Sequence, residues 1–245
     1  MLGNRSLRRR RSEAPRARHE YKAVWTEAAG SAEQARSAVA GEGSEASFWD
    51  GGAASCDVLR STVGINPDDV VLEIGCGVGR VGRSVAPLCR EWIGCDVSPT
   101  MLNHARTHLE HLENVRLVEI SGFDLTPIAS ESVDVVYCMV VFMHLDEWDR
   151  YSYVAEAMRV LAPGGRIYID NFNLCSDEGW ALFEQHRAIA PEDRPPQVSK
   201  SSTPAELETY LRRAGFDSIS LEENSRDTLA SRVRPETSGL SPCTG

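Results

Sequence analysis

A short apolar stretch that runs directly into a cluster of glycines is the feature that most restricts the fold of this chain. Residues 70–74 read VVLEI and are followed by GCGVGR at 75–80. An apolar run of this length, bounded by turn residues, is typical of a strand that is buried on both faces. The glycines permit a tight turn and a close approach of the backbone to a ligand. The sequence therefore predicts a strand, a tight turn and a helix over residues 78–88, and it suggests a ligand site at the turn.

Short apolar runs and helical stretches then alternate along most of the chain. Further strands are expected at residues 92–96, 115–120, 133–139, 166–170 and 216–221. Helices are expected at residues 98–109, 147–161, 179–189 and 203–214. Residues 228–233 are a candidate seventh strand, although they are poor strand formers. This alternation predicts an α/β fold with a Rossmann-like, doubly wound, mostly parallel sheet, in which ligands bind at the carboxyl ends of the strands.

The N-terminal part differs in composition from the rest. Residues 1–18 hold seven arginines and one acid and almost no apolar anchors, so we expect a disordered tail. Helices are expected at 21–40 and 48–63. Their aromatic residues either form a lid over the ligand or cover the edge of the sheet. The predicted boundaries are a tail at 1–18, a helical lid segment at 19–64, a ligand-binding domain at 65–233 and a C-terminal tail at 234–245.

Charge and cysteine usage exclude several function classes. The 245 residues carry a net charge of −10, and because residues 1–18 carry +6, the remainder carries −16. A protein with this much negative charge repels the phosphate backbones of nucleic acids, which argues against a nucleic-acid partner. No apolar run approaches membrane-spanning length, so no membrane partner is expected. The seven cysteines form neither a Cys-x-x-Cys pair nor a zinc pattern with histidine, which predicts reduced thiols in a cytoplasmic protein.

Two acids lie where a ligand would meet the strands. Glu73 is inside the first strand, where a carboxylate is costly to bury unless it accepts hydrogen bonds. Its charge would repel a pyrophosphate but would suit a ligand with a cationic amino-acid end. Asp96 ends the second strand, 21 residues after Gly75, the usual place for an acid that binds ribose hydroxyls. Residues 77–82 also satisfy the dinucleotide pattern G-x-G-x-x-G, so a nicotinamide cofactor stays open at this point.

Four ordered motifs resemble those of the class I S-adenosylmethionine-dependent methyltransferases that act on small molecules. They are VLEIGCGVGR (71–80), GCDVSPTML (94–102), SGFDL (121–125) with SVDVVYC (132–138), and VLAPGGRIYID (160–170). The resemblance covers roughly residues 58–221. It implies an enzyme that uses S-adenosylmethionine as methyl donor and releases S-adenosylhomocysteine.

The resemblance also implies where the cofactor lies. The glycine turn would give its methionine end access to the backbone, and Glu73 would anchor the turn or the ammonium group indirectly. Asp96 would take both ribose hydroxyls. The implied cofactor-binding residues are Glu73, Gly75, Gly77, Gly79, Arg80, Asp96, Val97, Met101, Gly122, Phe123 and Cys138. The third motif departs from the family pattern, because Phe123 separates the glycine from Asp124. Asp124 therefore either binds the adenine or caps the following turn.

Catalysis in such an enzyme needs few side chains. Methyl transfer is an in-line displacement, so the protein mainly aligns donor and acceptor and excludes water. A general base is needed only when the acceptor atom carries a proton. His144, just past the fourth strand, is either that base or a packed residue. Asp170 and Asn171, which end the fifth strand, resemble two ligands of the metal-dependent catechol-type enzymes. The third ligand position lacks a carboxylate, so we expect a polar pair that shapes the acceptor pocket, and no metal.

The acceptor is expected to be a small molecule that is methylated on oxygen or nitrogen. An amino-DNA methyltransferase is not expected, because residues 138–141 read CMVV where that class usually has an Asn- or Asp-Pro-Pro-aromatic motif. One alternative is a nicotinamide-dependent oxidoreductase, although no tyrosine has a lysine four residues later, as the short-chain type requires. Another is a protein that binds S-adenosylmethionine without turnover.

Overall fold

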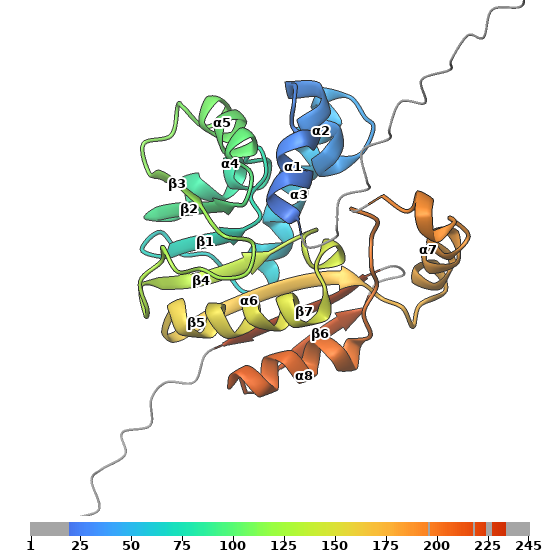
Figure 1. The fold of residues 1–245 in the computed structure, drawn as a ribbon. Coiled ribbons are helices and arrows are strands. Elements are labelled where there is room, and N and C mark those ends of the chain that lie inside the picture. Colours follow the sequence, from blue (N-terminus) through green and yellow to red (C-terminus); the bar gives the residue numbers. More distant parts are fainter. Residues whose placement is uncertain (1–19, 196, 218, 224–226, 234–245) are drawn as a thin grey trace, which may run out of the picture.

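The computed structural model describes residues 20–195, 197–217, 219–223 and 227–233, so the tails expected at 1–18 and 234–245 lie outside the described residues. Its strands form one sheet in the order β3-β2-β1-β4-β5-β7-β6 (Figure 1). Their bounds are β1 (Val70–Ile74), β2 (Glu91–Asp96), β3 (Val115–Glu119), β4 (Val133–Cys138), β5 (Leu161–Phe172), β6 (Ser220–Glu223) and β7 (Asp227–Val233).

The strand order places a topological switch point between β1 and β4. From β1 the chain continues to β2 and β3 on one side and then returns to β4 on the other. The pairs β1–β2, β2–β3, β1–β4 and β4–β5 are all parallel, and β7 pairs antiparallel with both β5 and β6. This confirms the expected doubly wound, mostly parallel sheet. A ligand site is therefore expected at the carboxyl ends of β1 and β4.

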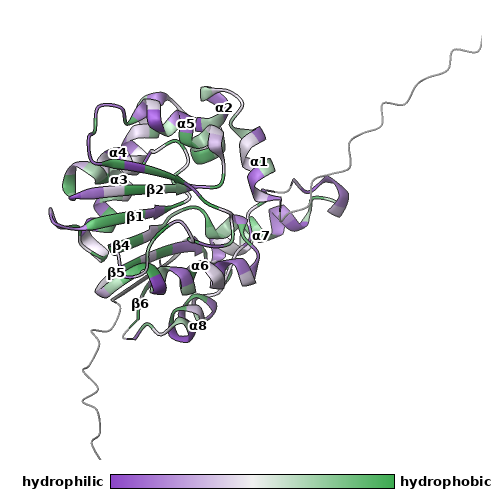
Figure 2. Cartoon of the chain, turned by 60° about the vertical axis from the view of Figure 1, so that its left-hand side comes forward, coloured by the Kyte–Doolittle hydropathy of each residue, from purple (hydrophilic) through white to green (hydrophobic). Residues whose placement is uncertain are grey.

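Helices cover both faces of the sheet. Their bounds are α1 (Tyr21–Ala28), α2 (Ala32–Ala40), α3 (Glu45–Thr62), α4 (Gly82–Val85), α5 (Pro99–His108), α6 (Glu147–Val160), α7 (Asp177–Arg187) and α8 (Pro204–Ala214), with short 3-10 turns at Ala86–Leu88, Phe142–His144 and Pro191–Asp193. Buried residues of α6 and α8 share one core cluster, a second cluster contains buried residues of α3, α4 and α5, and a third joins Ala35 of α2 to Phe48 of α3 and Met101 of α5. Hydrophobic residues concentrate along the central strands (Figure 2), as expected for strands buried on both faces. None of the described helices is both long and apolar enough to cross a membrane.

The helix expected at 21–40 is in fact two helices. The chain breaks at Gly30, a residue of low helix propensity, and Ser31 caps α2 by accepting a hydrogen bond from the backbone N–H of Gln34 at 3.2 Å. The helix expected at 78–88 was also wrong in extent. Only α4 and a 3-10 turn form there, because Gly79, with φ of +81°, is outside the helical region and Pro87 cannot continue an α-helix.

Strand β5 starts earlier than expected. The Pro163-Gly164-Gly165 stretch predicted a break before the strand, but β5 already begins at Leu161. The pairing of β4 with β5 shifts register between Val133 and Val135, so the stretch forms an irregularity inside the ladder. Such an irregularity accommodates a proline without an N–H and a glycine with φ of +78°.

The C-terminal strands also differ from the expectation. Phe216 is not in a strand but closes α8, because its N–H donates to the carbonyl of Leu211 at 3.0 Å, and β6 begins only at Ser220. The candidate strand at 228–233 exists as β7. It lies between β5 and β6 and pairs with both, so backbone pairing on two sides outweighs its weak strand propensity.

Candidate functional site

A cleft lies at the carboxyl ends of β1, β2 and β4, under residues of α1 and α2. It holds about 870 Å³ of space free of protein atoms, counting the part open to solvent. Its walls are mostly apolar, and its charged or titratable side chains include two acids, one arginine and one histidine. The residues that line it are Tyr21, Trp25, Ala38, Val39, Glu73, Ile74, Gly75, Cys76, Gly77, Arg80, Val81, Asp96, Val97, Met101, Ile120, Gly122, Met139, Val140, Val141, His144, Leu145 and Tyr153.

Most of the site residues expected from the sequence meet at this cleft. Those that line it are Glu73, Gly75, Gly77, Arg80, Asp96, Val97, Met101, Gly122 and His144. Those that do not are Gly79, Phe123, Cys138, Asp170 and Asn171. Residues from three of the four motifs thus converge on one cleft at the switch point.

The glycine turn has a backbone shape that other residues would not adopt easily. Gly75 and Gly77 have φ of +73° and +53°. A Cβ on Gly75 would lie 2.4 Å from Cγ2 of Val141, and one on Gly77 would lie 2.9 Å from Cγ2 of Val39. The N–H of Gly75 donates to the carbonyl of Cys95 at 2.8 Å, which fixes the turn to β2. The turn therefore brings bare backbone to the cleft.

Asp96 joins this turn to the start of α5. Its Oδ2 accepts the N–H of Gly77 and its Oδ1 accepts the N–H of Ser98, each at 2.8 Å. Burial raises the pKa of Asp96 to about 6, although these backbone N–H groups act in the opposite direction. Because each carboxylate oxygen can accept a second hydrogen bond, Asp96 retains acceptor capacity toward hydroxyl groups in the cleft.

Glu73 and Arg80 form the charged end of the cleft. Glu73 is buried, accepts a hydrogen bond on Oε2 from the hydroxyl of Tyr137 at 2.5 Å, and has a pKa raised by burial to about 8. Burial lowers the pKa of the Arg80 guanidinium, while the charges of Glu73 and Asp170 oppose that shift. The Nε of Arg80 is buried and has no hydrogen-bond partner among the described residues. A carboxyl group and an unsatisfied guanidinium donor that both line the cleft fit the ammonium and carboxylate of an amino-acid group.

The opposite end of the cleft is apolar. Val97, Met101 and Gly122 line it, which suits a flat aromatic ring. Phe123 is 44% exposed, and its ring contacts that of Tyr21 with centroids 5.8 Å apart. Asp124 accepts the N–H of Thr126 at 3.1 Å, which favours its turn-capping interpretation over adenine binding.

The N-terminal helices form one wall of the cleft. The hydroxyl of Tyr21 donates to Asp149 Oδ2 at 2.7 Å and accepts the N–H of Asp146 at 3.1 Å, which anchors α1 at the start of α6. Trp25 also lines the cleft. Phe48 and Trp49, the other two aromatic residues of this segment, are not among the residues that line it and pack against each other in an edge contact at 4.9 Å.

His144 lies on the cleft wall just beyond β4. Its Nδ1 is 2.9 Å from the carbonyl oxygen of Gln197, and a carbonyl can only accept, so Nδ1 carries a proton. In the neutral ring the basic nitrogen is then Nε2. The edge of the Trp25 ring packs on the imidazole with centroids 4.8 Å apart.

Asp170 and Asn171 hold backbone and loop segments. Oδ1 of Asp170 accepts the N–H of Val140 at 2.7 Å. Val140 is a non-glycine residue with φ of +60°, and it lies on the cleft wall. Asn171 is 1% exposed and donates to the hydroxyl of Ser202 at 2.9 Å. Within the described ranges no three His, Cys, Asp or Glu side chains are grouped so that they could hold a metal ion.

Sequence reasoning missed the partners of Glu73. Tyr137 of β4 and Trp92 of β2 lie on the strands beside β1, and together they connect to its carboxylate. Burial of a glutamate in a strand already required a hydrogen-bond donor nearby. The partner could have been sought among the polar residues of the adjacent strands, but their register is not visible in the sequence.

Comparison with known proteins identifies relatives of this domain. The family described as "Methyltransferase domain" matches residues 72–169. A malonyl-[acyl-carrier protein] O-methyltransferase from Methylococcus capsulatus is 30% identical over 158 residues, which are 64% of this chain and 54% of that protein. A ubiquinone biosynthesis O-methyltransferase from Cupriavidus pinatubonensis is 30% identical over 167 residues, 65% of each chain. The crystal structure of an S-adenosylmethionine-dependent methyltransferase from Methanosarcina mazei has a TM-score of 0.59 at 18% identity, covering 73% of this chain and 97% of that one.

The matches are partial in length. The chain spans about half to two thirds of the length of these two curated relatives. The shared region contains the sheet from β1 to β5 and therefore the strand ends that form the cleft.

Proposed function

Because this chain belongs to the class I S-adenosylmethionine-dependent methyltransferases, we propose that it transfers a methyl group to a hydroxyl of a small, largely apolar acceptor. S-adenosylmethionine is the family's cofactor, and when bound it supplies an activated methyl carbon. The observation that carries the choice of a hydroxyl acceptor is a histidine on an otherwise apolar cleft wall, with its protonated nitrogen turned to a carbonyl.

The residues of the cleft divide between the two ends of the cofactor. Glu73 and Arg80 would hold the ammonium and carboxylate of the methionine end, beside the bare backbone of the glycine turn. Asp96 would accept the ribose hydroxyls. Val97, Met101 and Gly122 would enclose the adenine. This assignment uses both acids and the arginine of the cleft lining and leaves His144 for the acceptor.

The acceptor would lie against the segment after β4. Met139, Val140, Val141 and Leu145 line this part of the cleft, together with Trp25 from the lid. These side chains exclude water and offer few polar partners, so they favour an acceptor that buries an apolar or aromatic ring. The two relatives described above are O-methyltransferases by name, which supports transfer to oxygen.

His144 would then remove the acceptor proton. The Gln197 carbonyl holds the ring in the tautomer in which Nε2 is basic, and Trp25 restricts its rotation. A phenol or alcohol must lose its proton as the methyl group arrives, so a positioned imidazole contributes about 10²–10⁴-fold to the rate.

The described cysteines are free thiols, which supports action in a reducing, cytoplasmic compartment.

Replacement of His144 tests this proposal. His144→Ala should lower kcat by roughly a hundredfold or more, while the Kd of S-adenosylhomocysteine stays within about twofold. Wild-type kcat should rise with pH through the range in which histidine loses its proton. The matched control is His186→Ala, because Nδ1 of His186 similarly contacts the Ser199 carbonyl, at 3.1 Å, but this residue does not line the cleft. A panel of hydroxylated aromatic acceptors with methyl-labelled cofactor provides the assay.

Other results would select a different mechanism. If both histidine variants retain kcat and only the acceptor KM rises, alignment alone carries the reaction and His144 is not a base. If a chelator abolishes activity and magnesium restores it, Asp170 and Asn171 regain their metal-ligand interpretation. Cofactor binding without transfer to any acceptor would favour a binding protein.

A further inference from the structure

Three side chains form a hydrogen-bonded chain across the centre of the sheet and end at the cleft. Nε1 of Trp92 lies 2.9 Å from the hydroxyl oxygen of Tyr137, and that hydroxyl lies 2.5 Å from Oε2 of Glu73. Trp92 and Tyr137 are fully buried, and Glu73 is 4% exposed. Of the three, only Glu73 lines the cleft.

The direction of both hydrogen bonds follows from the chemistry of the groups. An indole nitrogen can only donate, so the Tyr137 hydroxyl accepts from Trp92. Its single proton is then directed to Glu73. A hydrogen bond donated to a carboxyl group favours the ionised form of that group. Trp92 therefore fixes the rotation of the tyrosine proton, and the tyrosine favours a charged Glu73.

The sheet leaves room for these three hydrogen-bonded side chains at one place. In the register of the sheet, Glu73 lies opposite Gly94 of β2 on one side and opposite Tyr137 of β4 on the other. A Cβ on Gly94 would lie 2.3 Å from the Trp92 ring, and one on Gly82 of α4 would lie 2.2 Å from it. The absence of both side chains lets the indole reach Tyr137.

Burial is the largest influence on Glu73 and disfavours its charged form. With all neighbouring groups present, Tyr137 and Trp92 included, the pKa of Glu73 is raised to about 8, and the negative charge of Asp96 adds to that shift. Arg80 acts in the opposite direction but shares its charge with Asp170. The Cys76 thiol nearby has a pKa raised well above its ordinary value and stays neutral. Tyr137 and Trp92 are the uncharged donors that favour the carboxylate.

We propose that Tyr137, oriented by Trp92, is a positioning residue that aims the Glu73 carboxyl group at the ammonium group of the cofactor and favours its ionised form when the cofactor binds. Glu73 must lose its proton to form an ion pair with the ammonium group, and a hydrogen bond donated to the carboxylate makes that loss less costly. The proposal rests on the assignment of Glu73 to the methionine end of the cofactor. It is independent of the acceptor and of His144.

The test is calorimetric titration of S-adenosylhomocysteine into the full chain from pH 6 to 9. Tyr137→Phe removes one oxygen atom and should raise Kd by roughly ten- to a hundredfold at pH 7, the worth of a hydrogen bond to a charged group. The deficit should shrink toward pH 9, where a larger fraction of Glu73 is already ionised before binding. At pH 9, where Glu73 of the wild type is mostly ionised, the variant should also release more protons on binding than the wild type, measured in two buffers of different ionisation enthalpy.

Tyr168→Phe is the matched control. Tyr168 of β5 is the register partner of Tyr137, is equally buried and does not line the cleft. Its Kd should stay within about twofold of the wild type at every pH. Thermal unfolding of both variants checks the fold. If Tyr137→Phe is insoluble, Trp92→Phe breaks the first hydrogen bond and should shift the pH profile in the same direction.

Glu73→Gln separates failure of this proposal from failure of its premise. If Glu73→Gln binds S-adenosylhomocysteine as tightly as the wild type, the assignment of Glu73 is wrong. If Glu73→Gln weakens binding but Tyr137→Phe does not, or weakens it equally from pH 6 to 9, the positioning role is wrong. With Glu73→Gln already present, Tyr137→Phe should add less than about a twofold loss, because its effect passes through the carboxylate.

Discussion

Two buried acidic residues, Glu73 and Asp96, line the cleft, and we propose that they favour a ligand that carries hydroxyls and positive charge. Each is held by donors from other parts of the fold: a tyrosine hydroxyl for Glu73, and the N–H groups of Gly77 and Ser98 for Asp96. Burial raises the pKa of both. The effect of each carboxyl group on the stability of the ligand-free protein can therefore be measured separately from its effect on ligand affinity.

Asp96→Ala should have two effects. The loss of the hydroxyl acceptor should weaken S-adenosylhomocysteine binding by roughly 2–4 kcal/mol. The loss of the acceptor for two buried N–H groups should also lower the free energy of unfolding by about 1–3 kcal/mol, measured by urea titration. Asp124→Ala is the control, because Asp124 caps a turn outside the cleft and should leave Kd unchanged. Unchanged affinity in a folded Asp96→Ala protein would remove Asp96 from the site.

Glu73 should also make stability depend on pH. The unfolded chain loses this proton near pH 4.5, whereas the folded protein keeps it until about pH 8. Stability from this group is thus fully present below pH 4.5 and is lost as the pH rises through 8. The raised pKa of Asp96 makes stability fall with pH in the same direction, but this loss is complete near pH 6. Between pH 6 and 8, the Tm of ligand-free Glu73→Gln should therefore fall less than that of the wild type; an equally steep fall would contradict the shifted pKa.

At the scale of elements, the turn after β4 shapes the acceptor side of the cleft. Val140 has φ of +60°, which costs a β-branched residue about 1–2 kcal/mol. The Asp170 carboxylate accepts its N–H and holds it there. Asp170 thus acts on the cleft through backbone position, not by contact with its interior.

Asp170→Ala should lower the free energy of unfolding by about 1–3 kcal/mol, since a hydrogen bond to a charged group is lost. With Asp170→Ala already present, Val140→Gly should recover part of that loss, because glycine adopts this conformation without strain. Urea unfolding measures both effects. In activity assays Asp170→Ala should raise the acceptor KM while the Kd of S-adenosylhomocysteine holds. A variant with normal KM and a large loss of kcat would instead place Asp170 at the reacting atoms.

The sequence predicts elements well where their cause is local. Strands β1, β2 and β4 are mostly apolar runs, and the cap of α8 is a Thr-x-x-Glu pattern in which Thr203 accepts the Glu206 N–H. The early start of β5 and the whole of β7 depend on pairing with distant strands, which residue type does not encode. The same holds for the site. Motif residues were found, but Trp92 and Tyr137 reach Glu73 only through the register of three strands.

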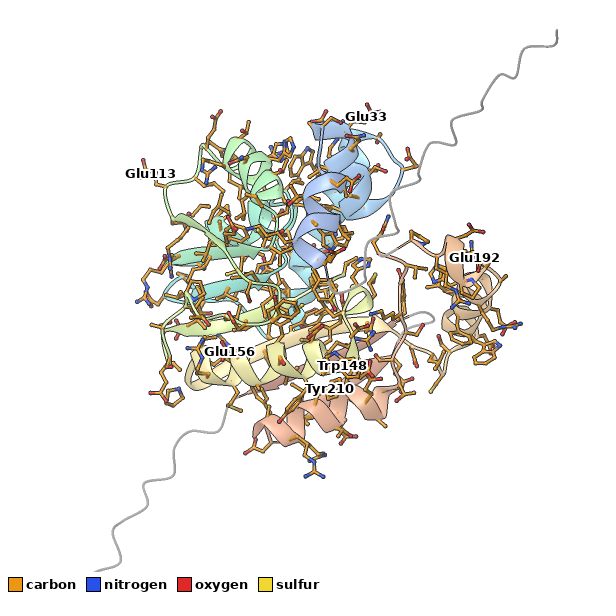
Figure 3. The ribbon with its side chains drawn as sticks, viewed as in Figure 1. Glu33, Glu113, Trp148, Glu156, Glu192 and Tyr210 are labelled. Carbon is orange, nitrogen blue, oxygen red and sulfur yellow. The ribbon has the colours of Figure 1, made fainter. Side chains whose placement is uncertain are left out.

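At the scale of the whole molecule, the strand order explains why separate motifs act together. At the switch point between β1 and β4 the chain leaves the two strands toward opposite sides, which creates a crevice at their carboxyl ends. Glu73, Asp96 and Gly122, which follow one another at intervals of more than 20 residues, meet there in one cleft. Helices α1 and α2 add Tyr21, Trp25 and two small residues as a wall. In the side-chain view, Trp148, which is 64% exposed, lies on α6 (Figure 3), and it is not among the residues that line the cleft.

The central claim is that this cleft binds S-adenosylmethionine rather than a dinucleotide. Titration calorimetry of the wild-type chain at pH 8 tests it most directly, with S-adenosylmethionine, S-adenosylhomocysteine and NAD as separate ligands. We expect one site with micromolar Kd for both sulfur compounds, because Glu73, Arg80 and Asp96 match their amino-acid and ribose groups, and no heat of binding for NAD. Binding of NAD together with no response to either sulfur compound would contradict the claim.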